Sequence, residues 1–327
     1  MKRNKKKVLS ALICALALVM CTLTGCQQMQ NVNRRYKVYM ITKSLTTQFW
    51  VSAVSGANAA RTEYNINLTL LAPDTEEEYE VQNEYIRQAI RDGADAIVFS
   101  AISYTENAEA IDEAADAGLK IVVIDSDVNS QKVHARIGTD NIQAGRMTAQ
   151  AVLACEEEEL SVGIVNFDLG TRNGQEREQG LREGLSEDPR VKEINTVNVP
   201  TSRDAAIAGS EILLADHPDT NVLVGLNEPL AVGVGAAVEK MGLQGRVRAV
   251  GFDTNLNCVD MMRDGAISAL IAQNPYAMGY LGVEAAWNLL EGQASYDPNI
   301  LIDTATSIIT PENMFTEGSQ RALFSFE

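Results

Sequence analysis

The chain has 327 residues and a formal net charge of −17, because 44 acidic side chains outnumber 27 basic ones. A protein this acidic repels phosphate backbones, which argues against nucleic acid as a partner. Hydrophobic residues make up 46% of the chain, as in a folded protein rather than a disordered acidic segment. About 300 residues are more than one hydrophobic core usually organises, so two lobes are expected.

The N-terminal segment has the pattern of an export signal. Five basic residues between positions 2 and 7 precede the apolar run Val8–Met20 and the ending Leu23-Thr24-Gly25-Cys26. The apolar run is shorter than the roughly 20 residues that a transmembrane helix needs, which favours a cleaved signal peptide. The ending resembles the lipobox of bacterial lipoproteins, and this resemblance implies cleavage after Gly25 and acylation of Cys26.

We therefore expect a signal peptide over residues 1–25, a polar tether over 26–35, and an exported protein held by lipid on the outer side of the cell membrane. Loss of the five basic signal residues would make the charge −17 − 5 = −22. Cys155 and Cys258 each lie in an apolar helical pattern, which predicts small buried side chains rather than a disulfide.

After the tether, short apolar runs alternate with amphipathic segments of helical periodicity. The runs 37–42 and 121–124 predict strands, and 48–64 predicts a helix. The alternation starts again near Ile142 and ends with a long helix over 276–290. Continuous apolar strands separated by amphipathic helices are typical of β-α-β units, in which helices cover both faces of a parallel sheet. The predicted fold class is α/β, with two doubly wound parallel-sheet lobes.

Residues suited to catalysis or metal binding are scarce. The two histidines, His134 and His217, lie near no serine or cysteine nucleophile motif. The sequence has no Cys-x-x-Cys, His-Glu-x-x-His or phosphate-binding glycine loop. The acidic runs 76–78 and 156–159 lack the residue spacing of a calcium loop and predict solvated helix ends. We therefore predict no catalytic residue, no metal and no cofactor.

Polar and aromatic side chains instead follow the predicted strands. Ligands bind beyond the carboxyl ends of the strands in open parallel sheets, so these side chains are expected to converge on one cleft. Carboxylates and amides suit sugar hydroxyls, and aromatic rings suit the apolar face of a sugar. The predicted ligand-binding residues are Lys43, Thr47, Phe49, Trp50, Asp125, Asp127, Gln175, Asn227, Asp253 and Gln273. Local roles are the alternative: Asp125 as a turn cap, and Phe49 and Trp50 as lobe core.

Several motifs together resemble the type I periplasmic sugar-binding proteins, most closely those that bind ribose. They are the aromatic pair after Gln48, DGADAIV at 92–98, IDSD at 124–127, IGTDN at 137–141, GQEREQGL at 174–181, HPD at 217–219, NEPLAVG at 227–233, VGFD at 250–253 and IAQNP at 271–275. The resemblance implies that Phe49 and Trp50 sandwich a sugar. It also implies that four residues bond the sugar hydroxyls: Asp125, Asn227, Asp253 and Gln273.

The same resemblance implies lobes joined by three crossovers, near residues 139–140, near 273–274 and after the last long helix. The first lobe would comprise 36–139 and 274–292. The second would comprise 140–273 and 293–315, followed by a tail over 316–327. Closure of the two lobes around the ligand would present both of them to the permease of an ABC importer.

The sequence departs from the ribose-binding pattern at two positions. Gln175 stands where ribose binders carry an arginine, and Ser126 follows Asp125 where they carry another. Arg177, two residues further on, is assigned no role in the cleft. Lys43 and the segment 125–129 resemble the autoinducer-2-binding relatives, in which a lysine and an aspartate hold a small furanosyl ligand, and Gln175 fits that scheme.

Three functions remain for comparison. The first is a lipoprotein that captures a sugar or sugar-like ligand for an ABC importer. The second is a sensory module in which the same closure reports to a membrane kinase or chemoreceptor. The third, an extracellular enzyme, lacks a base and nucleophile pair. A DNA-binding repressor of similar lobe architecture is excluded by the export signal and by the lack of a helix-turn-helix ahead of Tyr36.

Overall fold

The computed structural model describes residues 35–167 and 169–323, and from Lys37 on the chain forms one compact unit. The expected signal peptide, Cys26 and all of the tether except its last residue lie outside the described residues. Within the described ranges, no helix is both long enough and apolar enough to cross a bilayer.

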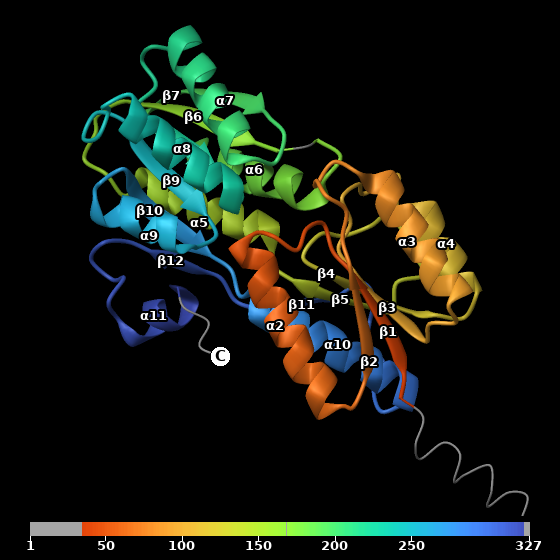
Figure 1. The fold of residues 1–327 in the computed structure, drawn as a ribbon. Helices are drawn as coiled ribbons and strands as arrows, with labels where there is room; N and C mark the ends of the chain where they lie inside the picture. Colours follow the sequence, from red (N-terminus) through yellow and green to blue (C-terminus); the bar gives the residue numbers. More distant parts are fainter. Residues whose placement is uncertain (1–34, 168, 324–327) are drawn as a thin grey trace, which may run out of the picture. The chain divides into compact units, whose positions relative to one another are not determined.

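The first lobe is built on a six-stranded parallel sheet (Figure 1). Its strand order is β11-β5-β4-β3-β1-β2, with bounds β1 Lys37–Ile41, β2 Asn67–Leu71, β3 Ala96–Phe99, β4 Lys120–Ile124, β5 Ala135–Gly138 and β11 Leu301–Asp303. Helices α2 (Gln48–Glu63) and α10 (Pro275–Glu291) share a hydrophobic cluster with one face of the sheet. Helices α3 (Tyr79–Arg91) and α4 (Ala108–Asp116) cover the other face.

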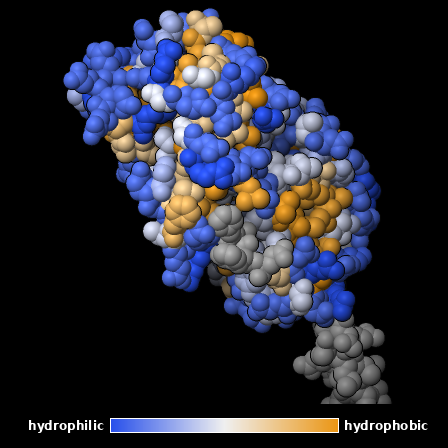
Figure 2. Space-filling view, turned by 60° about the vertical axis from the view of Figure 1, so that its left-hand side comes forward, coloured by the Kyte–Doolittle hydropathy of each residue, from blue (hydrophilic) through white to orange (hydrophobic). Residues whose placement is uncertain are grey.

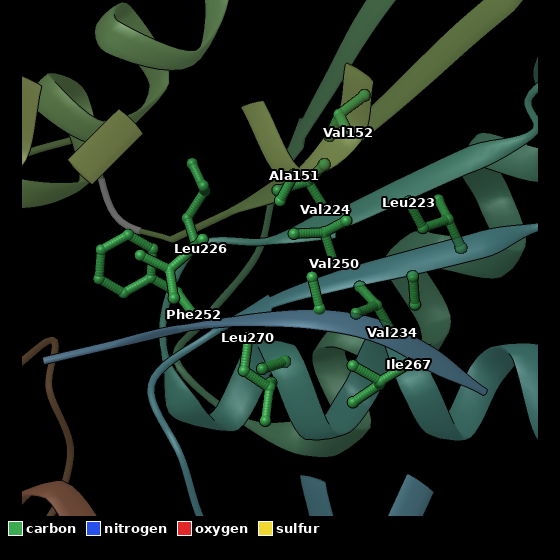
Figure 3. Close-up of a cluster of buried hydrophobic side chains, with 14 of the residues drawn as sticks. Ala151, Val152, Leu223, Val224, Leu226, Val234, Val250, Phe252, Ile267 and Leu270 are labelled. Atoms are coloured by element: carbon green, nitrogen blue, oxygen red, sulfur yellow. The ribbon is translucent and has the colours of Figure 1, made fainter. Parts of the chain in front are cut away.

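The second lobe repeats this design. Its strand order is β12-β10-β9-β8-β6-β7, with bounds β6 Leu160–Asn166, β7 Val191–Asn198, β8 Val222–Gly225, β9 Arg248–Phe252, β10 Ile267–Ala272 and β12 Ser307–Ile309. Only β12 runs antiparallel to its neighbour. The helices are α5 Asn141–Leu153, α6 Arg172–Leu185, α7 Arg203–Asp216, α8 Glu228–Lys240, α9 Leu256–Arg263 and α11 Glu317–Leu323. Branched aliphatic residues of β8, β9 and β10 pack against α8 in the core (Figure 3).

The predicted fold class is confirmed, since each lobe is a parallel-dominated sheet with flanking helices. The chain passes between the two sheets after β5, after β10 and between β11 and β12. One expectation is wrong: residues 293–315 do not all belong to the second lobe, because β11 pairs with β5 of the first sheet. A three-residue strand is too short to show its sheet in the sequence, and only the pairing with β5 places it.

Most of the large apolar side chains are inside the lobes. The exposed exceptions include Leu169, Leu256, Ile300 and Phe315. Figure 2 shows a face on which hydrophilic residues predominate and hydrophobic ones gather in a few separate groups. This distribution suits a strongly acidic chain whose cores are closed within each lobe.

Glycines allow α2 and α10 to approach until their backbones touch. A Cβ atom on Gly279 would overlap the carbonyl oxygen of Ala53, and a Cβ on Gly56 would overlap that of Tyr276. Both glycines therefore fix the distance between these two helices on one face of the first sheet. Since α2 also carries Phe49 and Trp50, this packing sets where the aromatic pair lies.

Gly279→Ala is expected to destabilise the protein by roughly 1–3 kcal/mol, because the added methyl group forces the two helices apart. Urea unfolding followed by circular dichroism measures the change. Gly318→Ala is the matched control, since a Cβ at this helical position meets nothing within 4 Å. Equal loss of stability in both variants would contradict the packing argument.

Candidate functional site

Loops at the carboxyl ends of the strands from both sheets face one another and enclose a cavity of about 20 Å³. The cavity is lined by Lys43, Thr47, Phe49, Trp50, Glu76, Asp125, Phe167, Asn173, Arg177, Asn227, Glu228, Pro229, Asp253 and Gln273. This volume has room for about one water molecule. A larger cavity of about 390 Å³ lies beside the crossovers and shares Phe49, Asp253 and Gln273 with the first.

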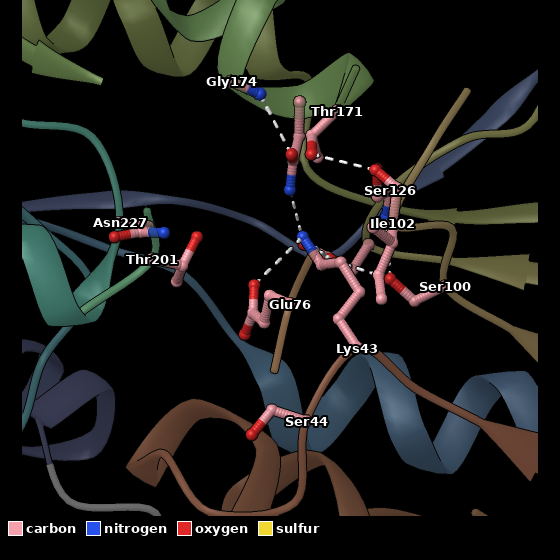
Figure 4. Close-up of polar contacts among 12 residues, drawn as sticks. Lys43, Ser44, Glu76, Ser100, Ile102, Ser126, Thr171, Gly174, Thr201 and Asn227 are labelled. Atoms are coloured by element: carbon pink, nitrogen blue, oxygen red, sulfur yellow. Dashed lines mark hydrogen bonds and ion pairs between the residues drawn. The ribbon is translucent and has the colours of Figure 1, made fainter. Parts of the chain in front are cut away.

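Lys43 is the cation at the first-lobe side of the cavity (Figure 4). Its Nζ lies 3.3 Å from Asp125 and 3.8 Å from Glu76, and its side chain is 5% exposed. The Trp50 Nε1–H donates to Glu76 at 3.1 Å. Burial raises the pKa of the Glu76 carboxyl, while the charge of Lys43 and the bond from Trp50 offset part of this effect. A largely buried glutamate and the buried Lys43 ammonium are thus held together beside the aromatic pair.

Asp125 follows β4 with φ of 57°, in the left-handed region that aspartate tolerates better than most residues. Ser100 Oγ donates to its carboxylate at 2.9 Å. From the second lobe, Asn173 Nδ2 donates to the same carboxylate at 3.2 Å. Asp125 therefore belongs to a hydrogen-bond network that includes both lobes, so the alternative of a turn cap alone does not describe its contacts.

Arg177 is the cation at the second-lobe side and is 1% exposed. Its guanidinium donates to Asn141 Oδ1 at 2.9 Å, to the Leu226 carbonyl at 2.9 Å and to Gln273 Oε1 at 3.0 Å. Its Cζ lies 3.9 Å from the ring centre of Phe252, a cation–π distance. Burial lowers the pKa of this guanidinium, and nearby carboxylates oppose the change. Because one planar group joins α5, the residue after β8 and a crossover, Arg177 fixes the hinge end of the cleft.

Gln273 links the hydrogen bonds of Arg177 to Asp253. Its Nε2 donates to Asp253 at 2.6 Å, and its Oε1 accepts from Thr139 at 2.8 Å. Burial raises the pKa of Asp253 to about 7, with Arg177 and Gln273 acting in the opposite direction. Both Thr139 and Gln273 lie at crossovers, so the hinge and the cleft share the same hydrogen bonds.

The cavity brings together eight of the ten predicted residues: Lys43, Thr47, Phe49, Trp50, Asp125, Asn227, Asp253 and Gln273. The other two lie elsewhere. Asp127 accepts from Arg136 Nε at 2.8 Å, away from the cavity lining. Gln175 is exposed, and its amide donates to the Leu169 carbonyl. On α6 the cavity-facing side chains are four residues apart, at Asn173 and Arg177, so position 175 faces solvent.

Five polar or aromatic residues of the cavity are not among the ten predicted ones: Glu76, Phe167, Asn173, Arg177 and Glu228. Two of them, Asn173 and Glu228, stand in segments after predicted strands, where the sequence argument places the cleft. The i, i+4 spacing of Asn173 and Arg177 was a usable signal. Glu76 gave no such signal in the sequence, because it stands in an acidic run that has the composition of a solvated helix start.

The comparison with protein families agrees with this geometry. The model of the periplasmic binding protein domain matches residues 38–294. The chain belongs to the periplasmic binding protein family. This family assignment implies an extracytoplasmic location for this periplasmic binding protein.

Characterised relatives cover most of this periplasmic binding protein. The D-ribose/D-allose-binding protein of Pseudomonas aeruginosa is 24% identical over 284 residues, which are 84% of this chain and 88% of the relative. The ribose import binding protein of Bacillus subtilis is 23% identical over 260 residues, 80% of this chain and 83% of the relative. The names of these relatives describe binding and import rather than catalysis.

Solved structures show the same fold. A solute-binding protein of a carbohydrate transporter from Agrobacterium radiobacter, solved with D-arabinose, has a TM-score of 0.85 at 24% identity and covers 89% of this chain and 100% of its own. A structure described as a sugar transporter from Clostridium phytofermentans is 34% identical, with a TM-score of 0.75 over 84% of this chain and 99% of its own.

Asp253→Asn is expected to change how stability depends on pH. The folded-state pKa of about 7 lies above the ordinary 3.8, so folding favours the protonated acid and the wild type loses stability as pH rises from about 4 to about 7. Asparagine cannot ionise, so its stability relative to wild type should rise by roughly 2–3 kcal/mol from pH 5 to pH 8.

Urea unfolding at the two pH values measures this difference. Asp219→Asn, at an exposed position, serves as the control. A stability difference between wild type and Asp253→Asn that is the same at pH 5 and pH 8 would contradict the raised pKa.

Proposed function

We propose that this protein is an extracytoplasmic solute-binding lipoprotein that captures a sugar or sugar-like ligand between its lobes and delivers it to an ABC importer. The observation that carries the proposal is the convergence of aromatic rings, carboxylates and amides from both lobes on one cavity. Relatives named for ribose and allose, and a structural neighbour solved with D-arabinose, support the ligand class.

The aromatic pair supplies the apolar contact in this proposal. Phe49 and Trp50 meet edge to face, with ring centres 4.9 Å apart and planes at 84°. Phe167 of the second lobe lines the same cavity and is 2% exposed. Rings from two lobes suit the C–H face of a sugar, because each ring presents a rigid apolar surface at little entropic cost.

Asn227 supplies a hydrogen-bond donor. Its Oδ1 accepts the Leu230 N–H at 3.1 Å as the cap of α8. This bond fixes the amide plane, and the amide nitrogen then lies on the side of the Lys43 cluster (Figure 4). Carboxylates of Asp125 and Asp253 provide the acceptors, so hydroxyl groups of a ligand would find partners of both kinds.

Ligand entry requires the lobes to separate. A cavity of about 20 Å³ has room for one water molecule, far less than a sugar occupies. The three crossovers are the only covalent connections between the sheets within the described residues, so they are the proposed hinge. Closure would then bury the ligand and place the rims of both lobes against a permease.

A furanosyl ligand is the second candidate. The contact between Lys43 and Asp125 at 3.3 Å favours it, since both residues line the cavity. Gln175, which the same resemblance implied as a third contact, lies outside.

A thermal-shift screen tests the function. The panel contains D-ribose, D-allose, D-arabinose, D-fucose, D-tagatose, D-apiose and autoinducer-2. A ligand present at a hundred times its dissociation constant should stabilise the protein by about 2.7 kcal/mol. No shift with any member of the panel would contradict the proposal, and a shift with autoinducer-2 alone would favour the furanosyl ligand.

Variants of the cavity test the site. Trp50→Ala and Asp125→Ala should each weaken binding of a sugar by roughly 2–4 kcal/mol, because both groups are buried at the centre of the proposed interface. Asn227→Ser keeps an N-cap oxygen but withdraws the amide, so affinity should fall while stability changes little. Gln175→Ala is the control and should bind as wild type does. Titration calorimetry gives the affinities, and unchanged affinity in all three cavity variants would show that the site lies elsewhere.

Cys26→Ser tests the anchor. Without the thiol, the N-terminus cannot be acylated, so the protein should move from the membrane fraction to the soluble exported fraction. Metabolic labelling with an alkyne fatty acid should mark the wild type alone. Labelling of the Cys26→Ser variant would contradict the lipobox interpretation.

A further inference from the structure

We propose that Glu228 is a positioning residue that couples ligand capture to lobe closure. In the closed form it holds the first turn of α2, which carries Phe49 and Trp50. The inference rests on the proposed function, because it concerns the same cavity. It assigns to Glu228 a role distinct from direct contact with a ligand.

The contacts of Glu228 extend from one lobe to the other. Glu228 is the first residue of α8 in the second lobe. Its Oε1 accepts the Gln48 N–H at 3.1 Å, and its Oε2 accepts the Phe49 N–H at 2.7 Å. Gln48 and Phe49 are the first two residues of α2 in the first lobe. A carboxylate of one lobe thus caps a helix of the other.

Glu228 supplies acceptors for N–H groups at the start of α2 that have no acceptor within the helix. The first N–H groups of a helix have no partner within the helix. Thr47 Oγ1 accepts the Trp50 N–H, at 3.5 Å. Glu228 takes the two N–H groups that precede it. A carboxylate at this end also interacts favourably with the helix dipole, and bonds to an ionised acceptor are stronger than neutral ones.

Glu228 is itself held in place. Asn255 Nδ2, at the start of α9, donates to Glu228 Oε1 at 2.9 Å. Three donors therefore converge on one carboxylate whose residue is 7% exposed. When the lobes separate, the two bonds to α2 break while the bond to Asn255 remains within the second lobe. The carboxylate consequently stabilises the closed form relative to the open one.

The turn that Glu228 holds is the one that carries the cavity's aromatic pair. Phe49 and Trp50 both line the cavity, and the neighbouring Asn227 lines it from the other lobe. In the proposal, the side chain of Asn227 therefore contacts the ligand. The side chain of the adjacent Glu228 bonds the start of α2 in the other lobe. A ligand that draws Asn227 toward the aromatic pair brings the carboxylate to the helix end in the same movement.

Glu228→Gln tests the role. The amide has nearly the same shape but a single acceptor, and its NH₂ group would face an N–H donor. Affinity for the panel sugar that gives the largest thermal shift should fall at least about tenfold, mainly through faster dissociation, since charged hydrogen bonds are lost only from the closed form. Stopped-flow fluorescence separates the two rate constants.

Tryptophan emission gives a readout that needs no ligand. The chain has two tryptophans, so a Trp287→Phe background isolates Trp50. Opening of the cleft exposes Trp50, and its emission in the sugar-free protein should shift to longer wavelength in Glu228→Gln. Glu183→Gln is the matched control: it loses a carboxylate bonded to Arg146 at 2.8 Å, between exposed side chains of the second lobe.

The outcomes separate the two proposals. If wild type binds sugar and Glu228→Gln has the same affinity and dissociation rate, the role of Glu228 is overturned while the proposed function stands. If no panel sugar binds wild type, the proposed function fails, and an unchanged Trp50 emission in Glu228→Gln then overturns the role of Glu228. Should Glu228→Gln fail to fold, Glu228→Asp keeps the charge, withdraws the carboxylate by one methylene, and should change the same quantities in the same direction.

Discussion

The polar contact between the two lobes is the constraint on which the rest of the structure depends. Six ionisable side chains line one small cavity, with Lys43 and Arg177 facing four carboxylates. None of these charges would be stable there alone, because burial removes the water that solvates them. Each is held by partners, and burial raises the pKa of two of the acids, Glu76 and Asp253.

The contacts within each lobe differ in kind from the contacts between the lobes. Each sheet has its own hydrophobic cores, and close helix contacts such as Gly279 against Ala53 make the first lobe rigid. Between the lobes the described contacts are largely polar, for example the hydrogen bond from Thr171 Oγ1 to the Ile102 carbonyl at 2.9 Å and the Arg177–Asp125 ion pair at 3.9 Å. Hydrogen bonds can be exchanged for bonds to water at small net cost, whereas a dry core cannot be opened. This difference supports a movement of intact lobes about the crossovers.

Hinge and cavity also share residues. Gln273 lies where the chain returns to the first lobe, yet it bonds Asp253 and Arg177 within the cavity. Thr139, at the first crossover, bonds the same amide. A change in the angle between the lobes must therefore alter the geometry of the groups proposed to bind the ligand. This arrangement, together with the bonds from the α8 residue Glu228 to the start of α2, supports the proposed link between ligand binding and closure.

The sequence by itself determined the two α/β lobes and most of the cleft. Apolar runs with intervening amphipathic helices indicated parallel sheets, and in such sheets the residues after each strand meet at one edge, so Asp125 and Asp253 could be named from their positions alone. The sequence did not indicate the strand β5, which has only four residues and is defined by its pairing with β4 and β11.

Tertiary structure decided the details that depend on orientation and distance. The rotation of α6 about its axis places Arg177 in the cavity and Gln175 in solvent, and local spacing does not give the direction of the cleft. Nothing in the sequence indicated the bond between Trp50 and Glu76 or the bond between Gln48 and Glu228, because the partners are separated by 26 and 180 positions along the chain. A buried charge is stabilised by the groups around it, and only the folded chain brings those groups together.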